Sequence, residues 1–305
     1  MTFFVQLPIG SYPDELPSAF GQGSIFDYTA AQALMWLSQL SYEQDVTIDA
    51  VLARWKLQPL AHLHSPAEGP ASDTATQGFV CRRDGTIIVA FAGTDPGMVK
   101  TVLTDAETAP DDRGVHPGFR RALDAVWTQL RAAAVLPGGD RLFVTGHSLG
   151  GALAVLAAFR LRGEAGINAE AVYTFGLPRV GGAKFGAIYE PILGFRTFRL
   201  VNGNDPVPSV PPSLLGFRHV GRSLFCPHAG TFDPESVPAA SLDDLPTFVK
   251  VETGHVFSIV RDMLRGRWPV PAQPGILGWL YGVLPGGLTD HMPARYLRAL
   301  GTPVR

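Results

Sequence analysis

The sequence has little of several features that would point to a common class of function. Only two cysteines occur among its 305 residues, Cys81 and Cys226; neither lies at metal-ligand spacing, and the sequence leaves open whether they pair. The net charge is −2, and no run of Lys and Arg exceeds two residues. A surface for nucleic acid needs clustered basic residues. We therefore expect neither a metal centre nor a nucleic-acid partner.

Long apolar stretches are also lacking. No apolar run approaches the ~20 residues needed to span a bilayer. The N-terminus, Met-Thr-Phe-Phe-Val-Gln-Leu-Pro, lacks the basic region and long apolar core of a signal peptide. These absences predict a soluble protein without a transmembrane segment, either cytoplasmic or non-classically exported. A hydrophobic content of 46% and a length of 305 residues are enough to bury a substantial core.

The stretch Arg141 to Arg160 contains the most informative pattern. A short apolar run, Leu142 to Val144, is typical of a buried strand, and the Ala and Leu residues from Ala152 onward favour a helix. Between them lies Gly146-His-Ser-Leu-Gly150, a G-x-S-x-G sequence. A strand that turns sharply into a helix strains its apex residue and exposes the apex hydroxyl, and glycines must flank it. The pattern predicts that Ser148 is a nucleophile.

The order of elements around this turn predicts the fold class. Strands are expected at 76–82 and 86–91, joined by a hairpin turn, and again at 171–175 and 195–201. Helices are expected at 29–42, at 48–55 and from His116 to near Leu130, while 62–73 is expected to be a loop. Alternating strands and helices predict an α/β fold with a mainly parallel sheet and helices on both faces.

Polar residues follow several of these strands. In a parallel sheet the carboxyl ends of the strands lie at one edge, where functional groups gather. Gly93-Thr94, Ser148, Phe175-Gly176 and Asn204-Asp205 all occupy such ends. A serine needs a base to take its proton and a carboxylate to orient that base. In chains with this turn, the carboxylate and then the histidine follow the serine. Asp205 therefore becomes the candidate carboxylate.

Four histidines follow Asp205, and the residues alone do not choose decisively among them. His219 lies in a predicted strand and His228 in a predicted loop. His255 opens a helix-like run, and His291 lies at a loop-to-helix junction that suits a base reaching across a site. His291 is slightly favoured over His255.

At this point the chain resembles the class 3 (fungal-type) lipase family of α/β-hydrolases. The resemblance covers roughly residues 74–221 and a short C-terminal piece. It rests on short motifs in the right order, Phe91-Ala-Gly-Thr94, His116-Pro-Gly-Phe119, Gly146-His-Ser-Leu-Gly-Gly151, Phe175-Gly-Leu-Pro-Arg-Val-Gly181, Asn202-Gly-Asn-Asp-Pro-Val-Pro208, and Asp290-His291 with Tyr296. It implies that Ser148, Asp205 and His291 form a catalytic triad, with an oxyanion hole from the backbone N–H groups of Thr94 and Leu149.

The resemblance also implies how the chain is divided. Residues 1–305 are expected to form one α/β-hydrolase domain, with a lid at 95–113 and an insertion at 222–288. From its residues alone, the segment 95–113 is equally well a small helix packed on the body or a mobile lid. Two departures from the family pattern stand out. Ala92 replaces the usual Arg before the Gly-Thr of the oxyanion strand, and Asp205 and His291 are 86 residues apart, more than is common. The extra chain includes an apolar run at 275–284, expected either as buried filler or as an apolar wall near His291.

The resulting prediction is a serine hydrolase that cleaves carboxylic esters, foremost acylglycerols, without a metal or organic cofactor. Its partners would be lipid or small ester substrates, with transient contact to a lipid interface. Related alternatives are a phospholipase A1, a feruloyl-type esterase or an acyltransferase that uses the same acyl-enzyme. An alternative from a different class is a lipid-binding module with a degenerate site.

Overall fold

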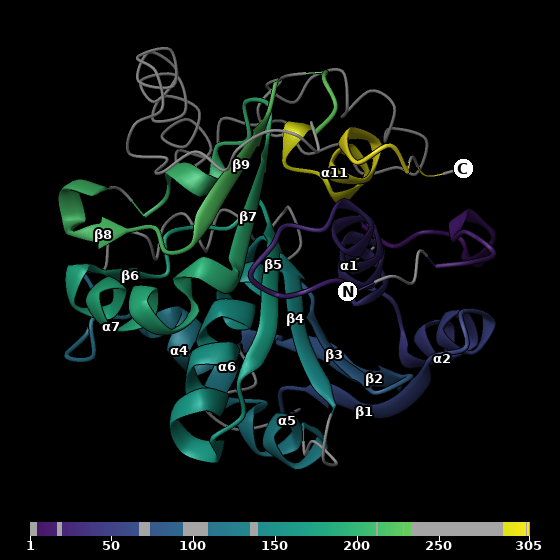
Figure 1. Ribbon diagram of the computed structural model, residues 1–305, viewed down its shortest axis with the longest axis horizontal. Coiled ribbons are helices and arrows are strands. Elements are labelled where there is room, and N and C mark those ends of the chain that lie inside the picture. Colours follow the sequence, from purple (N-terminus) through teal and green to yellow (C-terminus); the bar gives the residue numbers. More distant parts are fainter. Residues whose placement is uncertain are drawn as a thin grey trace, which may run out of the picture.

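The protein was analysed as a computed structural model (Figure 1). It describes residues 5–16, 20–66, 74–93, 109–134, 140–211, 213–227, 229–232, 289–302 and 304. Among these residues, seven strands form one sheet in the order β1-β2-β3-β4-β5-β7-β9, and β6 and β8 form a second, small sheet. The strands are β1 (Gln58–His64), β2 (Gln77–Arg83), β3 (Thr86–Phe91), β4 (Arg141–His147), β5 (Ala169–Phe175), β6 (Gly181–Gly182), β7 (Thr197–Asn202), β8 (Phe217–Arg218) and β9 (Arg222–Cys226).

The large sheet is mainly parallel, as predicted. Strands β3, β4, β5, β7 and β9 run parallel to one another, while β1 and β2 add an antiparallel edge next to β3. Asp84 and Gly85 both have positive φ, at 48° and 70°, and form the predicted two-residue hairpin between β2 and β3. Parallel strands bring their carboxyl ends to one edge, so the segments after β3, β4 and β7 meet there.

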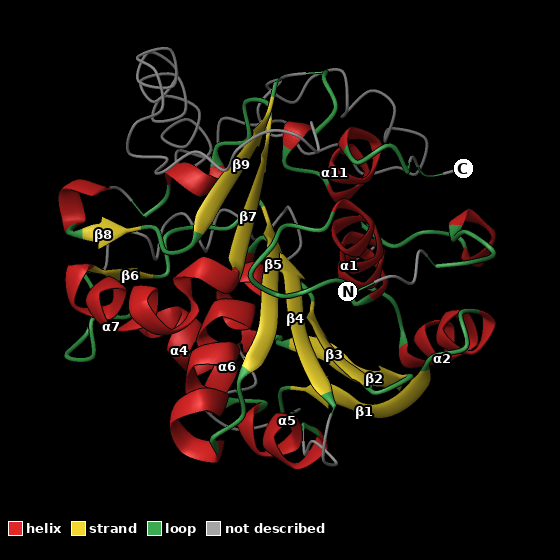
Figure 2. Ribbon diagram, in the orientation of Figure 1, coloured by secondary structure: helices red, strands yellow, loops and turns green. Residues whose placement is uncertain are grey.

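Helices cover both faces of the sheet (Figures 1 and 2). On one face lie α1 (Tyr28–Leu40), α2 (Asp45–Arg54) and α11 (Pro293–Ala299), and on the other α4 (Pro117–Asp124), α5 (Trp127–Ala133), α6 (Leu149–Ala165) and α7 (Ala183–Leu193). The strand side chains alternate between the two cores: Phe143 belongs to the first, and its neighbours Leu142 and Val144 to the second. This double cover makes β3 buried along its whole length.

Local sequence explains where several helices begin. Asp27 caps α1, because its side chain accepts a hydrogen bond from the N–H of Ala30. His116 caps α4 through its Nδ1 atom, which accepts from the N–H of Phe119, and Pro117 occupies the first helical position. Short 3₁₀ turns at η4 (Gly194–Arg196), η5 (Val207–Ser209) and η6 (Ser213–Leu215) connect the later elements.

Three expectations about secondary structure need correction. The predicted loop at 62–73 begins inside a strand, because β1 extends to His64. This strand lies at the edge of the sheet and is largely exposed, so its sequence lacks the apolar alternation by which a strand is predicted. The helix predicted from His116 to near Leu130 is two helices, with a break at Ala125 and Val126 that leaves the apolar stripe intact. Strand β9 was not predicted at all, and it extends the main sheet beyond β7.

The predicted lid and insertion lie mostly outside the described residues. Of the lid, only residues 109–113 are described, and there Asp111 forms an ion pair with Arg120 of α4, with Oδ2 and Nε 2.7 Å apart. Of the insertion, 222–227 and 229–232 are described, and β9 places the first five of these in the main sheet. The apolar run at 275–284 lies outside as well. Within the described part of the chain, no helix is long and apolar enough to cross a membrane.

Candidate active site

Ser148 lies at the turn between β4 and α6. Its backbone has φ 58° and ψ −128°, a strained conformation for a residue with a side chain. The turn is tight enough to require glycine on either side. A Cβ on Gly146 would come within 2.2 Å of the backbone of Gly150, and a Cβ on Gly150 within 2.2 Å of the carbonyl oxygen of Phe91. The strained apex predicted from the G-x-S-x-G sequence is therefore present.

Three side chains predicted from the sequence meet at this turn. The Nε2 atom of His291 lies 2.9 Å from Oγ of Ser148, and its Nδ1 atom lies 3.0 and 2.9 Å from the two carboxylate oxygens of Asp205. All three residues are buried, with exposed fractions of 4 to 6%. Because a carboxylate only accepts hydrogen bonds, Nδ1 carries the proton and Nε2 is free to accept from the serine hydroxyl.

The loops that carry the acid and the histidine are tied to each other. Asp205 follows β7, and His291 comes two residues before α11. The Asn202 amide donates to the carbonyl oxygen of Asp290 at 3.0 Å, and the N–H of Asn204 donates to the Asp290 carboxylate at 2.8 Å. Asp290, the residue next to His291, therefore ties the segment of His291 to that of Asp205, although 86 positions of sequence separate these two residues. The sequence motifs contained Asn202, Asn204 and Asp290 but gave no indication of these contacts.

The Asp205 carboxylate accepts two further hydrogen bonds. The hydroxyl of Tyr296, on α11, donates to Oδ2 at 2.6 Å, and the N–H of Val207 donates to Oδ1 at 2.9 Å. Burial raises the pKa of Tyr296 well above its usual value, and the negative charge of Asp205 raises it further. Tyr296 therefore stays a neutral donor. Its position in the C-terminal motif was recognised from the sequence, but its contact with the acid was not.

Of the two residues predicted to form the oxyanion hole, the structure describes Leu149 but not Thr94. Leu149 is the first residue of α6, and its N–H belongs to the first turn, where a helix leaves its amide groups without intrahelical acceptors. Thr94 lies outside the described residues, which end on this side at Gly93. Gly93 abuts the turn, because a Cβ there would lie 2.9 Å from Cβ of Ser148. The end of β3 thus reaches the turn that carries Ser148.

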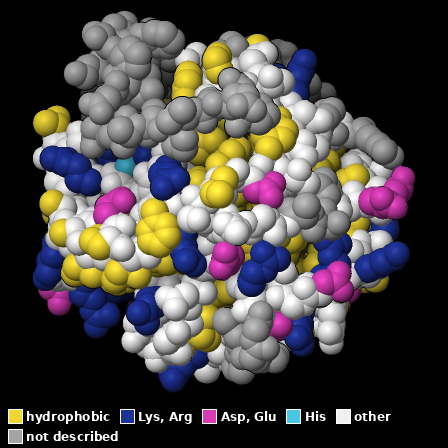
Figure 3. Space-filling view, viewed as in Figure 1, with side chains coloured by type: hydrophobic (Ala, Val, Ile, Leu, Met, Phe, Trp, Pro, Cys, Tyr) yellow, Lys and Arg dark blue, Asp and Glu magenta, His cyan; other side chains and the backbone are white. Residues whose placement is uncertain are grey.

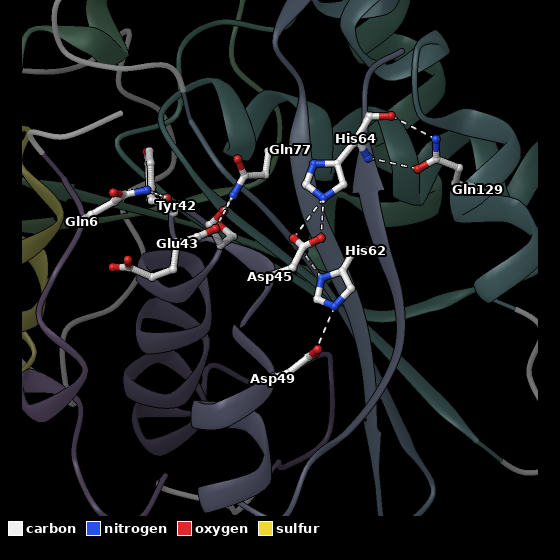
Figure 4. Close-up of polar contacts among 10 residues, drawn as sticks. Gln6, Tyr42, Glu43, Asp45, Asp49, His62, His64, Gln77 and Gln129 are labelled. Carbon is white, nitrogen blue, oxygen red and sulfur yellow. Dashed lines mark hydrogen bonds and ion pairs between the residues drawn. The ribbon is translucent and has the colours of Figure 1, made fainter. Parts of the chain in front are cut away.

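The other histidines have separate surroundings. His219 donates from Nε2 to the carbonyl oxygen of Pro208 at 2.8 Å, while His228 and His255 lie outside the described residues. His62 and His64 lie at the surface, on β1, and contact Asp45 and Asp49 of α2 (Figure 4). Within the described part, no group of three or more His, Cys, Asp or Glu is arranged to hold a metal ion.

Comparison with known proteins identifies the region that carries this site. Residues 89–215 match the family model described as Lipase (class 3). Over these residues, the chain is similar to the class 3 lipases. The class 3 region contains Ser148 and Asp205, while His291 lies beyond it in sequence.

Fungal lipases are similar to the chain in sequence. The secreted mono- and diacylglycerol lipase MDL2 of Malassezia globosa is 32% identical over 151 residues, which are 44% of this chain and 49% of that protein. The secreted mono- and diacylglycerol lipase 1 of Fusarium solani is 40% identical over 110 residues, 35% of this chain and 32% of that protein. The chain thus spans about half or less of the curated relatives it matches.

Solved lipase structures share the fold of the class 3 region. One, described as "a serine protease triad forms the catalytic centre of a triacylglycerol lipase", gives a TM-score of 0.54 at 28% identity and covers 64% of this chain and 78% of its own. The Rhizomucor miehei lipase in its native propeptide complex gives 0.53 at 27% identity, over 65% of this chain and 67% of its own. The fold is that of an α/β-hydrolase, as predicted.

The expected localisation needs correction. The N-terminal residues led to the expectation of a cytoplasmic or non-classically exported protein. Three relatives of the class 3 region are named as secreted lipases, and these names point to an extracellular protein instead. The earlier expectation failed because it took the lack of one N-terminal pattern as a sign of the compartment.

Proposed function

We propose that the chain is a serine hydrolase of carboxylic esters, acting on acylglycerols, with Ser148 as nucleophile, His291 as general base and Asp205 as the orienting carboxylate. The observation that carries the proposal is the unbroken series of hydrogen bonds from the Ser148 hydroxyl through the His291 ring to Asp205, all between 2.9 and 3.0 Å. Such a series lets the imidazole take the serine proton while the carboxylate stabilises the resulting cation.

The reaction would proceed in two halves. Oγ of Ser148 bonds to the ester carbonyl carbon as its proton moves to Nε2 of His291. The tetrahedral intermediate then breaks its bond to the alcohol oxygen, which leaves with that proton. Water repeats the sequence on the acyl-enzyme and releases the acid. We assign the oxyanion to the N–H groups of Leu149 and Thr94, where the loss of one donor typically costs a factor of about 10² to 10³ in kcat.

The substrate class rests on relatives of the class 3 region. Two of them are named mono- and diacylglycerol lipases, and one solved structure is described as a triacylglycerol lipase. Their names also support an extracellular place of action. We therefore assign acylglycerols in preference to phospholipids or feruloyl esters.

We further propose transient contact with a lipid interface, supported by exposed apolar side chains. Leu214 on η6 is 97% exposed, and Ile188 on α7 is 48% exposed. Figure 3 shows hydrophobic side chains gathered over α7 at the left of the view. Exposed apolar groups that lie together often mark contact with a lipid or protein partner.

The decisive test replaces Ser148 with Ala. We expect Ser148→Ala to lower kcat on a p-nitrophenyl ester by about 10⁴ or more, because it removes the hydroxyl that is hydrogen-bonded to His291 and would bond to the acyl carbon. A fluorophosphonate probe should label the wild type and not the variant. Ser213→Ala, which changes an exposed serine on η6, is the matched control and should keep full activity and labelling. Unchanged turnover in folded Ser148→Ala, or a wild type that the probe does not label, would contradict the proposal.

Substrate choice is tested on the same proteins. Mono-, di- and triacylglycerols, phosphatidylcholine and a feruloyl ester are each offered, dispersed and as an emulsion or vesicle. We expect acylglycerols to be hydrolysed fastest, and Leu214→Ser to lower turnover on emulsions but not on dispersed esters. Faster hydrolysis of phosphatidylcholine would reassign the enzyme as a phospholipase. Equal turnover of emulsions by Leu214→Ser would remove the proposed interface contact.

A further inference from the structure

The histidine inside the G-x-S-x-G sequence makes two hydrogen bonds that the mechanism does not use. Nδ1 of His147 lies 2.7 Å from the hydroxyl of Tyr42, and its Nε2 lies 2.6 Å from the backbone carbonyl oxygen of His291. All three residues are buried. The ring also packs on His291, with centroids 4.6 Å apart, and edge-on to Tyr296 at 5.7 Å.

These contacts fix which ring nitrogen carries the proton. A backbone carbonyl oxygen only accepts, so Nε2 of His147 must donate to His291. Burial lowers the pKa of His147 well below its usual value, and the neighbouring His291 lowers it further. The ring is therefore neutral, and Nδ1 accepts a hydrogen bond from the Tyr42 hydroxyl. A neutral ring beside His291 also adds no positive charge when that base becomes a cation.

Tyr42 itself contacts the third part of the site. A Cβ on Gly93 would lie 2.3 Å from the Tyr42 hydroxyl oxygen, so this hydroxyl is in close contact with the end of β3. Tyr42 further belongs to a small apolar cluster with Val5, Ala92 and Met292. One side chain thus contacts the segment before Thr94, the histidine that precedes the nucleophile and the residue after the base.

The backbone around Tyr42 is held from both sides. Gln6 donates from its amide to the carbonyl oxygen of Tyr42 at 3.0 Å, and Gln77 donates to the carbonyl oxygens of Ser41 and Glu43 at 2.9 and 2.6 Å (Figure 4). The side-chain amide of Gln39 donates to the carbonyl oxygen of Val5 at 2.7 Å. The end of α1 is therefore a fixed support and not a loose loop.

We propose that Tyr42 and His147 are positioning residues, which hold the main chain of His291 at the distance from Ser148 that proton transfer requires. The Tyr42 hydroxyl fixes the ring of His147, and the ring fixes the His291 carbonyl. This inference rests on the proposed hydrolase function. A displacement of about 1 Å in a reacting group can cost a factor of about 10² in rate.

Two amide variants separate positioning from packing. In His147→Gln the amide nitrogen falls near the position of Nε2 and can still donate to the His291 carbonyl. In His147→Asn the amide reaches only the Tyr42 side. We expect His147→Asn and Tyr42→Phe to lower kcat about 10-fold to 100-fold with KM little changed, and His147→Gln to recover most of that loss. Tyr189→Phe, which removes another buried hydroxyl bonded to Thr197, is the control and should keep kcat.

The outcomes are distinguishable from failure of the proposed function. A wild type without esterase activity would contradict the function, and the ring state of His147 would still be readable from nitrogen NMR shifts. We expect those shifts to report a neutral ring protonated at Nε2 at pH 5 to 8 in the wild type, and a changed tautomer population in Tyr42→Phe. Equal kcat losses in the Gln and Asn variants, wild-type kcat in both, or a His147 ring protonated at Nδ1 alone would each overturn the inference.

Discussion

At the residue scale, the Asp205 carboxylate accepts hydrogen bonds from His291, Tyr296 and Val207. A buried carboxylate remains ionised only when such donors replace water. The Val207 N–H is fixed by the turn that follows Asp205. The Tyr296 hydroxyl, in contrast, is supplied by a helix far away in sequence, and it also accepts a hydrogen bond from the N–H of Asn202 at 3.1 Å, so its loss removes two buried hydrogen bonds.

We expect Tyr296→Phe to lower both activity and stability. The change removes the 2.6 Å donor to Oδ2, which leaves one carboxylate oxygen with less compensation for burial. Hydrogen bonds to charged groups contribute about 1.5 to 3 kcal/mol, so the free energy of unfolding should fall by about that amount. Urea denaturation measures the stability, and kcat on a p-nitrophenyl ester measures activity. Tyr189→Phe is again the control, with a stability loss of about 1 kcal/mol and normal kcat; if Tyr296→Phe behaves like it, the proposed support of Asp205 is wrong.

The sequence predicted some of these residues better than others. Ser148 could be predicted locally, because its glycines and its flanking strand and helix are adjacent in the chain. Asp205 could be proposed because it follows a strand. His291 needed the family resemblance, since its loop-to-helix junction favours it only slightly over His255. The contact of Tyr42 with His147 could not be predicted, because it joins α1 to β4 across 105 positions of sequence.

At the scale of elements, α6 contains a matched pair of glycines. A Cβ on Gly150 would lie 2.2 Å from the Phe91 carbonyl oxygen and 2.8 Å from the Ala92 carbonyl carbon, both backbone atoms that cannot rotate away. A Cβ on Gly163, near the other end of the same helix, would meet no atom within 4 Å. The same substitution therefore has opposite consequences at the two positions.

We expect Gly150→Ala to lower the free energy of unfolding by about 3 kcal/mol or more and to abolish turnover, because α6 must move away from the end of β3. Gly163→Ala should raise that free energy by about 0.5 to 1 kcal/mol, because Ala favours the helix over Gly, and it should leave kcat unchanged. Thermal and urea denaturation of the two variants side by side measure the difference. A Gly150→Ala protein with wild-type stability and activity would show that the close approach of α6 to β3 is not required.

Elements with their own turn residues and apolar runs were predicted from the sequence. Strands that form mainly because they pair with a neighbouring strand were not. The β2–β3 hairpin and the β4–α6 turn have their own turn residues and apolar runs. Strand β1 lies at an exposed edge, and β9 is short; each is specified by its partner strand more than by its own residues. The break between α4 and α5 keeps the apolar stripe, so periodicity alone could not locate it.

At the scale of the whole molecule, the buried His147 and the half-buried His219 make stability depend on pH. Burial lowers the pKa of both His147 and His219 well below the usual value of 6.5, and the charges of Arg199 and Arg179 lower that of His219 further. Below pH 6.5 the unfolded chain binds protons at these positions while the folded chain does not, so unfolding becomes easier as the pH falls. Each group should remove about 1.4 kcal/mol per pH unit until its folded pKa is reached.

The raised pKa of Glu43 acts in the opposite direction, since the folded state holds a proton there more readily than the unfolded chain. When the wild type is compared with a variant that lacks only the His219 imidazole, the contributions of Glu43 and of every other shared group to the pH dependence cancel. His219→Gln keeps an amide donor for the Pro208 carbonyl but does not titrate. We expect the free energy of unfolding of the wild type, from urea denaturation between pH 7 and pH 5, to fall more steeply than that of His219→Gln, by about 1.4 kcal/mol per pH unit below 6.5. Parallel pH profiles for the two proteins would mean that His219 gains its proton equally in both states, and that the cationic surroundings inferred from Arg179 and Arg199 do not oppose its charge.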